Sequence, residues 1–320
     1  MLFRSLIDTY LAVHETAAPI EVSNVGLPSE TVSGLSEDGH AGGQFARPVL
    51  SERLARTLLQ TKPDLVLACY GMNDGIYLPF DDERFRKFRV GIEAMHAAVV
   101  ASGAKIVHVT PPCFDEQKGG YVGYAAVIDR YAAWLLAQRA IGWDVVDVHG
   151  AMQSYLQAQR ARDPQFALAG DGVHPDALGH WLMARAILAH VGAESAAAAP
   201  DASAFLATLT EGAAVLALVE QRQRWMRDAL LTAIGHQRPG LPQGLPLADA
   251  RRKVQDLNTQ IQRLVEPFRG GKSTWQGFDR YDILSKRRPA IVVVPKKALP
   301  GRPWADRKST RLNSSHLVIS

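Results

Sequence analysis

The sequence predicts an α/β fold, a three-layer sandwich in which helices cover both faces of a parallel sheet. Two observations lead to this prediction. Between residues 20 and 191, short apolar runs of strand length alternate with longer segments whose apolar residues recur at helical spacing. The run 65–70 (LVLACY) is apolar throughout, which is typical of a strand buried on both faces of a parallel sheet. Such strands and helices form right-handed βαβ units, and ligands bind beyond the carboxyl ends of the strands.

The predicted elements follow one another in a regular order. The chain opens with an amphipathic helix at 1–12, and a short strand at 20–26 ends at Gly26. The remaining strands are runs of apolar and β-branched residues, predicted at 65–70, 105–110 and 143–148. The remaining helices have apolar residues at helical spacing and are predicted at 49–60, 85–101, 121–140 and 176–191. Asp176 lies near the positive end of the dipole of the helix at 176–191, which favours a helix start there.

The second half of the chain changes character twice. An alanine-rich stretch at 194–201 is a plausible hinge, and two helices are predicted beyond it at 204–234 and 247–264. From residue 273 the pattern favours strands. The predicted division is a first domain at 1–193, a helical extension at 200–268, the start of a β-rich domain at 273–304, and a tail at 306–320.

Two C-terminal segments resemble sequences from elsewhere. The runs 292–297 (VVVPKK) and 300–304 (PGRPW) resemble the opening β-hairpin of an α/β-hydrolase domain, which implies the start of a second domain. Residues 306–320 resemble a translated sequencing adaptor of the kind found at the ends of metagenomic reading frames, and we exclude them from fold reasoning.

Composition excludes several classes of protein. Hydrophobic residues make up 47% and charged residues 21% of the 320 positions, and no apolar run reaches the roughly 18 residues of a membrane span. The net charge of +4 falls to +2 without the tail, which gives no reason to expect nucleic-acid binding. Cys69 and Cys113 have neither disulfide-framework nor zinc-site spacing. We therefore expect a soluble protein without metal or other cofactor.

Two short motifs carry the chemistry. Residues 71–74 (GMND) follow the apolar strand at 65–70, and residues 171–174 (DGVH) precede the helix predicted at 176–191. Ester cleavage builds negative charge on a carbonyl oxygen, and the Asn73 amide is a suitable donor to it. His174 has the chemistry of a general base, and Asp171, three residues earlier, can hold its other ring nitrogen. The alternative interpretation is a loop asparagine plus a helix cap at 174–175.

In this order, the motifs resemble the SGNH (GDSL) hydrolase family over roughly residues 1–193. Its third block, Gly-x-Asn-Asp, matches Gly71 and Asn73, and its last block, Asp-x-x-His, matches Asp171 and His174. Its second block resembles 24–31 (NVGLPSET), where Ser29 stands at the usual glycine. The resemblance implies catalytic roles for His174 and Asp171, and oxyanion or binding roles for Asn73, Gly71 and Ser29. The second oxyanion donor would be the Ser29 backbone N–H, which serine can supply if its backbone torsions suit.

The resemblance also implies that a part is missing. The family begins with a strand that ends in Gly-Asp-Ser, and no such sequence precedes residue 20. In the family order 2-1-3-4-5, that strand would lie between 20–26 and 65–70. We therefore expect an N-terminally truncated chain that is poorly stable, because backbone groups in the sheet centre lack partners, and inactive, because the nucleophile is absent. A secretory signal would precede the missing strand, so the compartment of the parent stays open.

For the intact parent, the resemblance implies ester hydrolysis through a seryl intermediate, with small acyl esters or acetylated carbohydrate as substrates. Two alternatives remain: a non-catalytic ligand- or carbohydrate-binding module on the same scaffold, and a flavodoxin-like nucleotide binder. Reading the upstream DNA in frame would discriminate them. Other candidate residues are weaker: we expect core or surface roles for His14, His40, His108 and His190, a turn at His236, and a linker at 270–274, which only ends like a phosphate loop.

Overall fold

A computed structural model describes residues 2–14, 20–265, 271–275, 278–285, 288–294, 305–307 and 315–318. The chain divides into two compact units, Met1–Asn258 and Thr259–Ser320. The two candidate motifs lie in the first unit.

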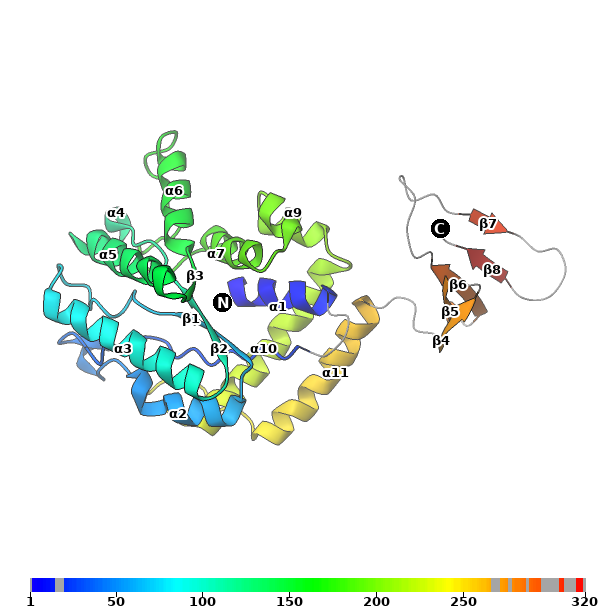
Figure 1. Ribbon diagram of the computed structural model, residues 1–320, viewed down its shortest axis with the longest axis horizontal. Helices are drawn as coiled ribbons and strands as arrows, with labels where there is room; N and C mark the ends of the chain where they lie inside the picture. The colour runs from blue at the N-terminus through cyan, green and yellow to red at the C-terminus, as the bar shows by residue number, and fades with distance from the viewer. Residues whose placement is uncertain are drawn as a thin grey trace. The chain divides into compact units, whose positions relative to one another are not determined.

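The first unit is built on a parallel sheet of three strands in the order β1-β2-β3 (Figure 1). These strands are β1 (Leu65–Cys69), β2 (Lys105–Val109) and β3 (Asp144–Val146). Ala68 of β1 lies opposite His108, which lies opposite Val145 of β3. The predicted α/β fold with a parallel sheet is therefore confirmed.

Helices cover both faces of this sheet, because side chains alternate between its faces. One core lies between the sheet and α3 (Asp82–Ala101) and α5 (Tyr124–Ala137), and it includes Ile106 and Val145. The opposite core includes Val107 and Val146 and is formed with α1 (Leu2–His14), α6 (Val148–Arg160) and α7 (Ala177–His190). Figure 1 shows these two helical groups on opposite sides of the strands. A further helix, α2 (Leu50–Thr61), adds Leu50 to the first core.

The strand predicted at 20–26 is wrong, since these residues form no strand. An isolated extended segment gains little unless its N–H and C=O groups meet a neighbouring strand. In the described part of the chain, β1 pairs with β2 alone, so no strand stands between β1 and residues 20–26. Instead, Asn24 accepts a hydrogen bond from the Gly26 N–H at 3.1 Å, and Val25 packs on a helical core.

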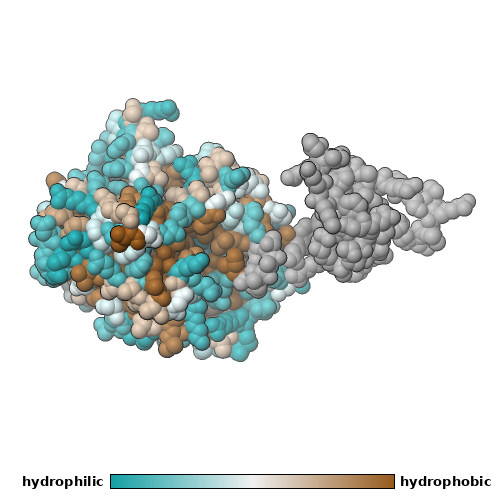
Figure 2. Space-filling view, viewed as in Figure 1, coloured by the Kyte–Doolittle hydropathy of each residue, from teal (hydrophilic) through white to brown (hydrophobic). Residues whose placement is uncertain are grey.

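One face of β1 is partly uncovered at its amino-terminal half, because Leu65 and Leu67 point to the same side of the sheet. Leu65 and Leu67 are 50% and 43% exposed, although the sequence predicted a strand covered on both faces. Figure 2 shows hydrophobic side chains gathered near the middle of one face of this unit, among hydrophilic ones. The expected destabilisation by unpaired backbone groups in the sheet stays a prediction.

The helix α6 was not predicted. The apolar pattern predicted a strand up to residue 148, but β3 ends at Val146. Asp147 caps α6 there by accepting the Gly150 N–H at 2.8 Å. Val148, Met152 and Leu156 then bury one helical face. The unit also contains the short helices α4 (Glu116–Gly119), η1 (His40–Gly43), η2 (Gln138–Ile141), α8 (Glu194–Ala198) and α9 (Ala202–Ala207).

The predicted extension packs on the first domain through α10 (Gly212–Ile234). Buried Asp8 of α1 accepts hydrogen bonds from Arg222 at 2.6 Å and Gln223 at 2.9 Å. Burial raises the pKa of Asp8, against the opposing effect of Arg222. The next helix is α11 (Leu247–Val265), whose Ala250 and Val254 share a core with α10. Among the described helices, none is long and apolar enough to cross a bilayer.

The second unit contains a five-stranded sheet in the order β4-β5-β6-β8-β7. Its strands are β4 (Gly271–Trp275), β5 (Phe278–Ser285), β6 (Arg288–Val294), β7 (Ala305–Arg307) and β8 (Ser315–Val318). Residues 271–274 therefore lie in a strand, and the linker expected there is wrong. The four predicted domain boundaries and the adaptor origin of 306–320 stay predictions, and residues 308–314, 319 and 320 of that tail lie outside the described residues.

Candidate active site

The two motifs lie in loops next to the sheet. Asn73 follows the carboxyl end of β1, and the loop that carries Asp171 and His174 leads into α7. The predicted strand-end position of the first motif is thus observed. The structure places Asn73 against Glu30, the residue after Ser29, and places Asp171 against His174.

His174 and Asp171 form a direct pair. The His174 Nδ1 lies 2.7 Å from Asp171 Oδ2, and Asp171 Oδ1 accepts the backbone N–H groups of Val173 and His174 at 2.9 and 2.8 Å. Partial burial raises the pKa of Asp171, but these hydrogen bonds outweigh it and lower the pKa to about 2. An ionised Asp171 that accepts from Nδ1–H leaves Nε2 of a neutral imidazole as the acceptor. The His174 side chain is 84% exposed, so this nitrogen is accessible to a reactant.

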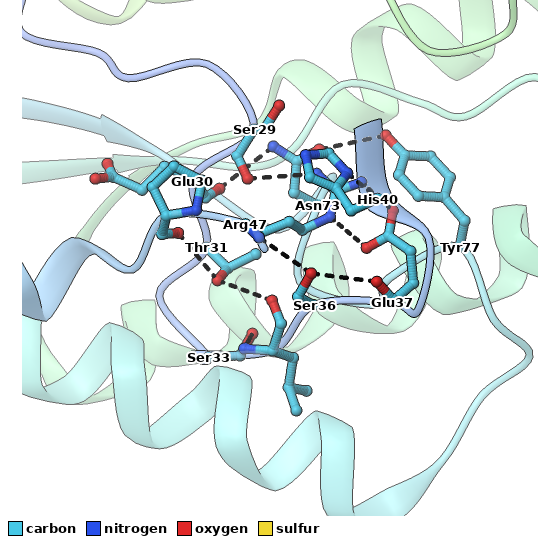
Figure 3. A network of polar contacts seen from close by, with 12 residues as sticks. Ser29, Glu30, Thr31, Ser33, Ser36, Glu37, His40, Arg47, Asn73 and Tyr77 are labelled. Carbon is cyan, nitrogen blue, oxygen red and sulfur yellow. Dashed lines mark hydrogen bonds and ion pairs between the residues drawn. The ribbon is translucent and has the colours of Figure 1, made fainter. Parts of the chain in front are cut away.

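Asn73 is held by two contacts that orient its amide. Its Nδ2 donates to the Glu30 carbonyl at 3.3 Å, and its Oδ1 accepts from the Tyr77 hydroxyl at 3.3 Å. These contacts direct the amide nitrogen toward the loop that contains Ser29 (Figure 3). An amide nitrogen carries two hydrogens, so one remains for a further acceptor.

Ser29 stands where the family's second block usually has glycine, and its backbone has a conformation that glycine favours. Its φ is 66°, in the left-handed region that glycine adopts freely and most other residues avoid. Arg47 Nη1 donates to the Ser29 carbonyl at 3.3 Å and stabilises this turn. The backbone torsion of Ser29, on which its predicted role depends, is therefore one that glycine would adopt.

We expect Ser29→Gly to keep or raise the free energy of unfolding, because glycine relieves the left-handed strain, and Ser29→Val to lower it by about 1–3 kcal/mol. Urea unfolding of both variants measures the effect. The matched control is Ser102→Gly, where φ is −76°. There, glycine adds unfolded-state entropy and removes a 2.6 Å hydrogen bond to Val99, so it should destabilise. Equal effects of glycine at both positions would contradict this interpretation.

Asp74 forms hydrogen bonds to both the loop that follows Ser29 and the loop that follows β1. Its Oδ1 accepts the N–H groups of Val32 and Ser33 at 2.8 and 2.9 Å, and its Oδ2 accepts the Gly71 N–H at 3.0 Å. Complete burial raises the pKa of Asp74 to about 6, although the hydrogen bonds from Ser33, Val32 and Gly71 oppose the rise. The Gly71 N–H is thus engaged within the protein. Gly71 itself has a φ of 125° and lies against Pro111, so a side chain would not fit there.

A buried ion pair is formed by Glu30, the residue after Ser29. Arg53 of α2 makes two hydrogen bonds to the Glu30 carboxylate, at 2.6 and 2.7 Å, and the Tyr70 hydroxyl donates to the same carboxylate at 2.6 Å. Arg53 and Glu30 are 2% and 3% exposed. Burial, followed by the negative charge and hydrogen bond of Glu30, raises the pKa of Tyr70, which therefore stays a donor. This cluster holds Glu30 in place, and the Glu30 carbonyl accepts the hydrogen bond from Asn73.

A second ion pair, which the sequence did not suggest, completes the network. Arg47 donates to both oxygens of Glu37 at 2.6 Å, and its guanidinium lies 5.3 Å from the centre of the Tyr77 ring (Figure 3). His40 also contacts Glu37, at 3.3 Å, a contact that the sequence analysis did not indicate. No short motif joins these residues, and the loop between them folds back only in the tertiary structure.

Tyr77 connects the two halves of the candidate site. Burial raises its pKa to about 12; Arg47 opposes this rise, while Glu37, Tyr121 and Asp171 add to it. The Tyr77 ring centre lies 6.3 Å from that of Phe114, and the next residue, Asp115, donates its N–H to the Gly172 carbonyl at 3.0 Å, so a short chain of contacts joins the Asn73 loop to the His174 loop. The Tyr77 ring also packs on Tyr121, with ring centres 4.9 Å apart.

The other histidines have different surroundings. His108 is buried and stacks with His96 and Trp143, as expected for a core residue, and His190 Nε2 lies 2.8 Å from Asp144. His149 pairs with Asp129 at 2.9 Å, a contact that the sequence did not indicate. In the described ranges, no three His, Cys, Asp or Glu side chains converge so that they could hold a metal ion.

Comparison with known proteins gives a family and several similar structures. The sequence model of the GDSL-like lipase/acylhydrolase family matches residues 5–182, more than half of the chain. A catalytic mutant of an acetylxylan esterase from Geobacillus stearothermophilus is 23% identical; the match covers 58% of this chain and 78% of that one, with a TM-score of 0.44. A lipase/acylhydrolase from Enterococcus faecalis is 22% identical over 59% of this chain and 84% of that one, also with a TM-score of 0.44. None of the curated proteins matches significantly.

Proposed function

The chain belongs to the GDSL-like lipase/acylhydrolase family, and on this premise we propose that its intact protein hydrolyses acyl esters through a Ser–His–Asp mechanism. The observation that carries the proposal is the Asp171–His174 pair, with a 2.7 Å contact at Nδ1 and an exposed ring. The substrates proposed are small acyl esters, acetylated carbohydrates among them.

The first half of the proposed reaction transfers the acyl group to a serine. His174 Nε2 takes the proton of the serine hydroxyl while the serine oxygen attacks the ester carbonyl. The Ser29 N–H and the Asn73 amide donate to the oxyanion that forms, and each such donor contributes about 3 kcal/mol to transition-state stabilisation. The C–O bond to the alcohol then breaks, and His174 gives its proton to the leaving alkoxide. Asp171 stabilises the imidazolium in between.

The second half returns the serine. Water attacks the acyl carbonyl and gives a proton to His174, the serine oxygen leaves, and His174 returns the proton to it. The products are one carboxylic acid and one alcohol, and one water is consumed.

We propose that the nucleophile is a serine encoded upstream of residue 1, at the end of a strand followed by Gly-Asp-Ser. In the described chain, no serine hydroxyl forms a hydrogen bond with His174. We therefore expect no turnover of p-nitrophenyl acetate by residues 1–320. We expect turnover when the upstream coding sequence is included and encodes a strand followed by Gly-Asp-Ser.

Expression of the extended reading frame tests the proposal. His174→Ala in that protein should lower kcat by about 10³-fold or more, because the general base is lost. The matched control is His14→Ala, since His14 lies at the exposed end of α1, and it should leave kcat unchanged. Turnover by residues 1–320 that survives His174→Ala would refute the mechanism. An upstream sequence without Gly-Asp-Ser, together with binding but no turnover, would favour the binding module instead.

A further inference from the structure

Arg47 is connected to both residues proposed as donors to the oxyanion. Its guanidinium donates to the Ser29 carbonyl at 3.3 Å, and it lies 5.3 Å from the centre of the Tyr77 ring, within the range of a cation–π contact. The Tyr77 hydroxyl in turn donates to Asn73 Oδ1 at 3.3 Å. One side chain therefore contacts the first donor residue directly and reaches the second through a single intermediate (Figure 3).

Arg47 is itself held in one position. It is only 7% exposed, its Nε and Nη2 donate to the Glu37 carboxylate at 2.6 Å each, and Nη1 donates to Ser29. Its neighbour Pro48 accepts the Thr31 N–H at 2.9 Å, which joins the backbone beside Arg47 to the segment that follows Ser29. Because the guanidinium is a planar, rigid fork and each of its nitrogens is engaged, its contacts fix a geometry rather than a mere proximity.

The contacts of Arg47 fall on strained backbone. Ser29 has a φ of 66°, and Tyr77 has a φ of 56° directly after Ile76 at 47°. These torsions lie in the left-handed region, which side chains other than glycine avoid. Such torsions persist only where the surrounding structure holds them, and they are concentrated at functional sites. Without Arg47, we expect both segments to relax toward ordinary torsions.

The Asn73 amide needs more than one contact to be oriented. The Glu30 carbonyl accepts from Nδ2, and an amide held at that atom alone can still turn about the hydrogen bond. The Tyr77 hydroxyl at Oδ1 supplies the second point that fixes the plane of the amide. Displacement of Tyr77 would therefore change the direction of the remaining N–H of Asn73.

We propose that Arg47 is a positioning residue for the oxyanion site, which sets the direction of the Ser29 N–H and, through Tyr77, that of the Asn73 amide. This role rests on the proposed ester hydrolysis, in which both groups are donors. Donors to an oxyanion act mainly in the transition state, so the loss of Arg47 lowers kcat and leaves KM nearly unchanged.

Steady-state hydrolysis of p-nitrophenyl acetate by the protein extended with its upstream coding sequence tests the role. Arg47→Met should lower kcat about 10²-fold, the effect of a misplacement of about 1 Å, with KM within about twofold. Tyr77→Phe keeps the ring that packs on Tyr121 and Tyr124 but loses the hydroxyl, and should lower kcat about tenfold. In the Asn73→Ala background, Tyr77→Phe should have no further effect, because it acts through Asn73.

The matched control is Arg56→Met. Arg56 likewise joins a carboxylate, that of Glu52 at 2.7 Å, to a backbone carbonyl, that of Ile234 at 2.8 Å. Its loss should leave kcat unchanged. An equal decrease in Arg56→Met would show a general loss of structure, and additive effects of Tyr77→Phe and Asn73→Ala would show that Tyr77 does not act through Asn73. Either result overturns the proposal, and so does an unchanged kcat in Arg47→Met.

Amide NMR spectra of residues 1–320 provide a readout that does not depend on turnover. Arg47→Met should shift or broaden the signals of the Ser29 backbone N–H and the Asn73 side-chain amide, Tyr77→Phe only the latter, and Arg56→Met neither. Unchanged signals in Arg47→Met overturn the assignment whatever the turnover. If the signals change but the extended protein hydrolyses no ester, the proposed hydrolysis is refuted, whereas the finding that Arg47 holds these two groups stands.

Discussion

Replacing Arg53 with Met is expected to lower the free energy of unfolding by about 3–5 kcal/mol, because it leaves the Glu30 carboxylate buried without its cation. Glu30 and Arg53 are almost completely buried, and two hydrogen bonds of 2.6 and 2.7 Å join them. Methionine fills most of the volume of arginine, so the effect reports the charge rather than a cavity. Urea unfolding followed by circular dichroism measures it as a lower midpoint at an unchanged slope.

The matched control is the same substitution at Arg86. Arg86 also pairs with a carboxylate at 2.6 Å, that of Glu83, but both side chains are more than half exposed. Water screens such a pair, so Arg86→Met should stay close to the unsubstituted protein. In the double variant Glu30→Gln/Arg53→Met, the unpaired buried charge is absent, and part of the lost stability should return. Equal effects of Arg53→Met and Arg86→Met would contradict the importance of burial.

Acidification is expected to have the second large effect. Protonation of His108 alone should lower the free energy of unfolding by up to about 3 kcal/mol. Burial lowers the pKa of His108 to about 4, and the neighbouring His96 adds to this. The folded protein therefore holds His108 neutral, whereas the unfolded chain binds its proton near pH 6.5. The contribution is complete above pH 6.5 and is lost progressively as the pH falls from 6.5 to about 4. Urea titrations at pH 7, 5.5 and 4.5 measure this loss.

A variant without the titrating ring separates this term from other acid effects. In His108→Gln, stability at pH 7 falls, but the decrease between pH 7 and 4.5 should be smaller than in the unsubstituted protein. Ile106→Val removes a buried methylene from the same strand and should lower stability by a similar amount at every pH. If His108→Gln keeps the full dependence on pH, the buried histidine is not its origin. His180 is a second contributor, since burial lowers its pKa to about 4 as well.

The reach of sequence reasoning differs between the two halves of the candidate site. Asp171 and His174 are three residues apart in one loop, so their contact depends on local geometry, and the motif predicted it correctly. The partners of Asn73 are less local: Tyr77 is four residues away, but Glu30 is 43 positions away. The motif identified Asn73 without indicating what holds its amide.

The errors have a common physical cause. Residues 20–26 have a strand-like composition, yet a strand requires a partner, and none stands next to them in the described chain. The helix α6 was missed because a single cap, Asp147, ends the preceding strand earlier than apolarity suggests. In each case, hydrogen-bond partners outweighed the intrinsic preference of the segment.

By itself, the sequence determined the alternating order of elements, the parallel sheet, the family and the pairing of Asp171 with His174. These features follow from periodicity and from short motifs, in which the interacting residues are neighbours along the chain. The tertiary structure alone decided the left-handed backbone of Ser29, its support by Arg47 and the buried pair of Arg53 with the next residue, Glu30. Those contacts join segments far apart in the chain, and their strength depends on burial, because exclusion of water is what makes an ion pair or a hydrogen bond costly to break.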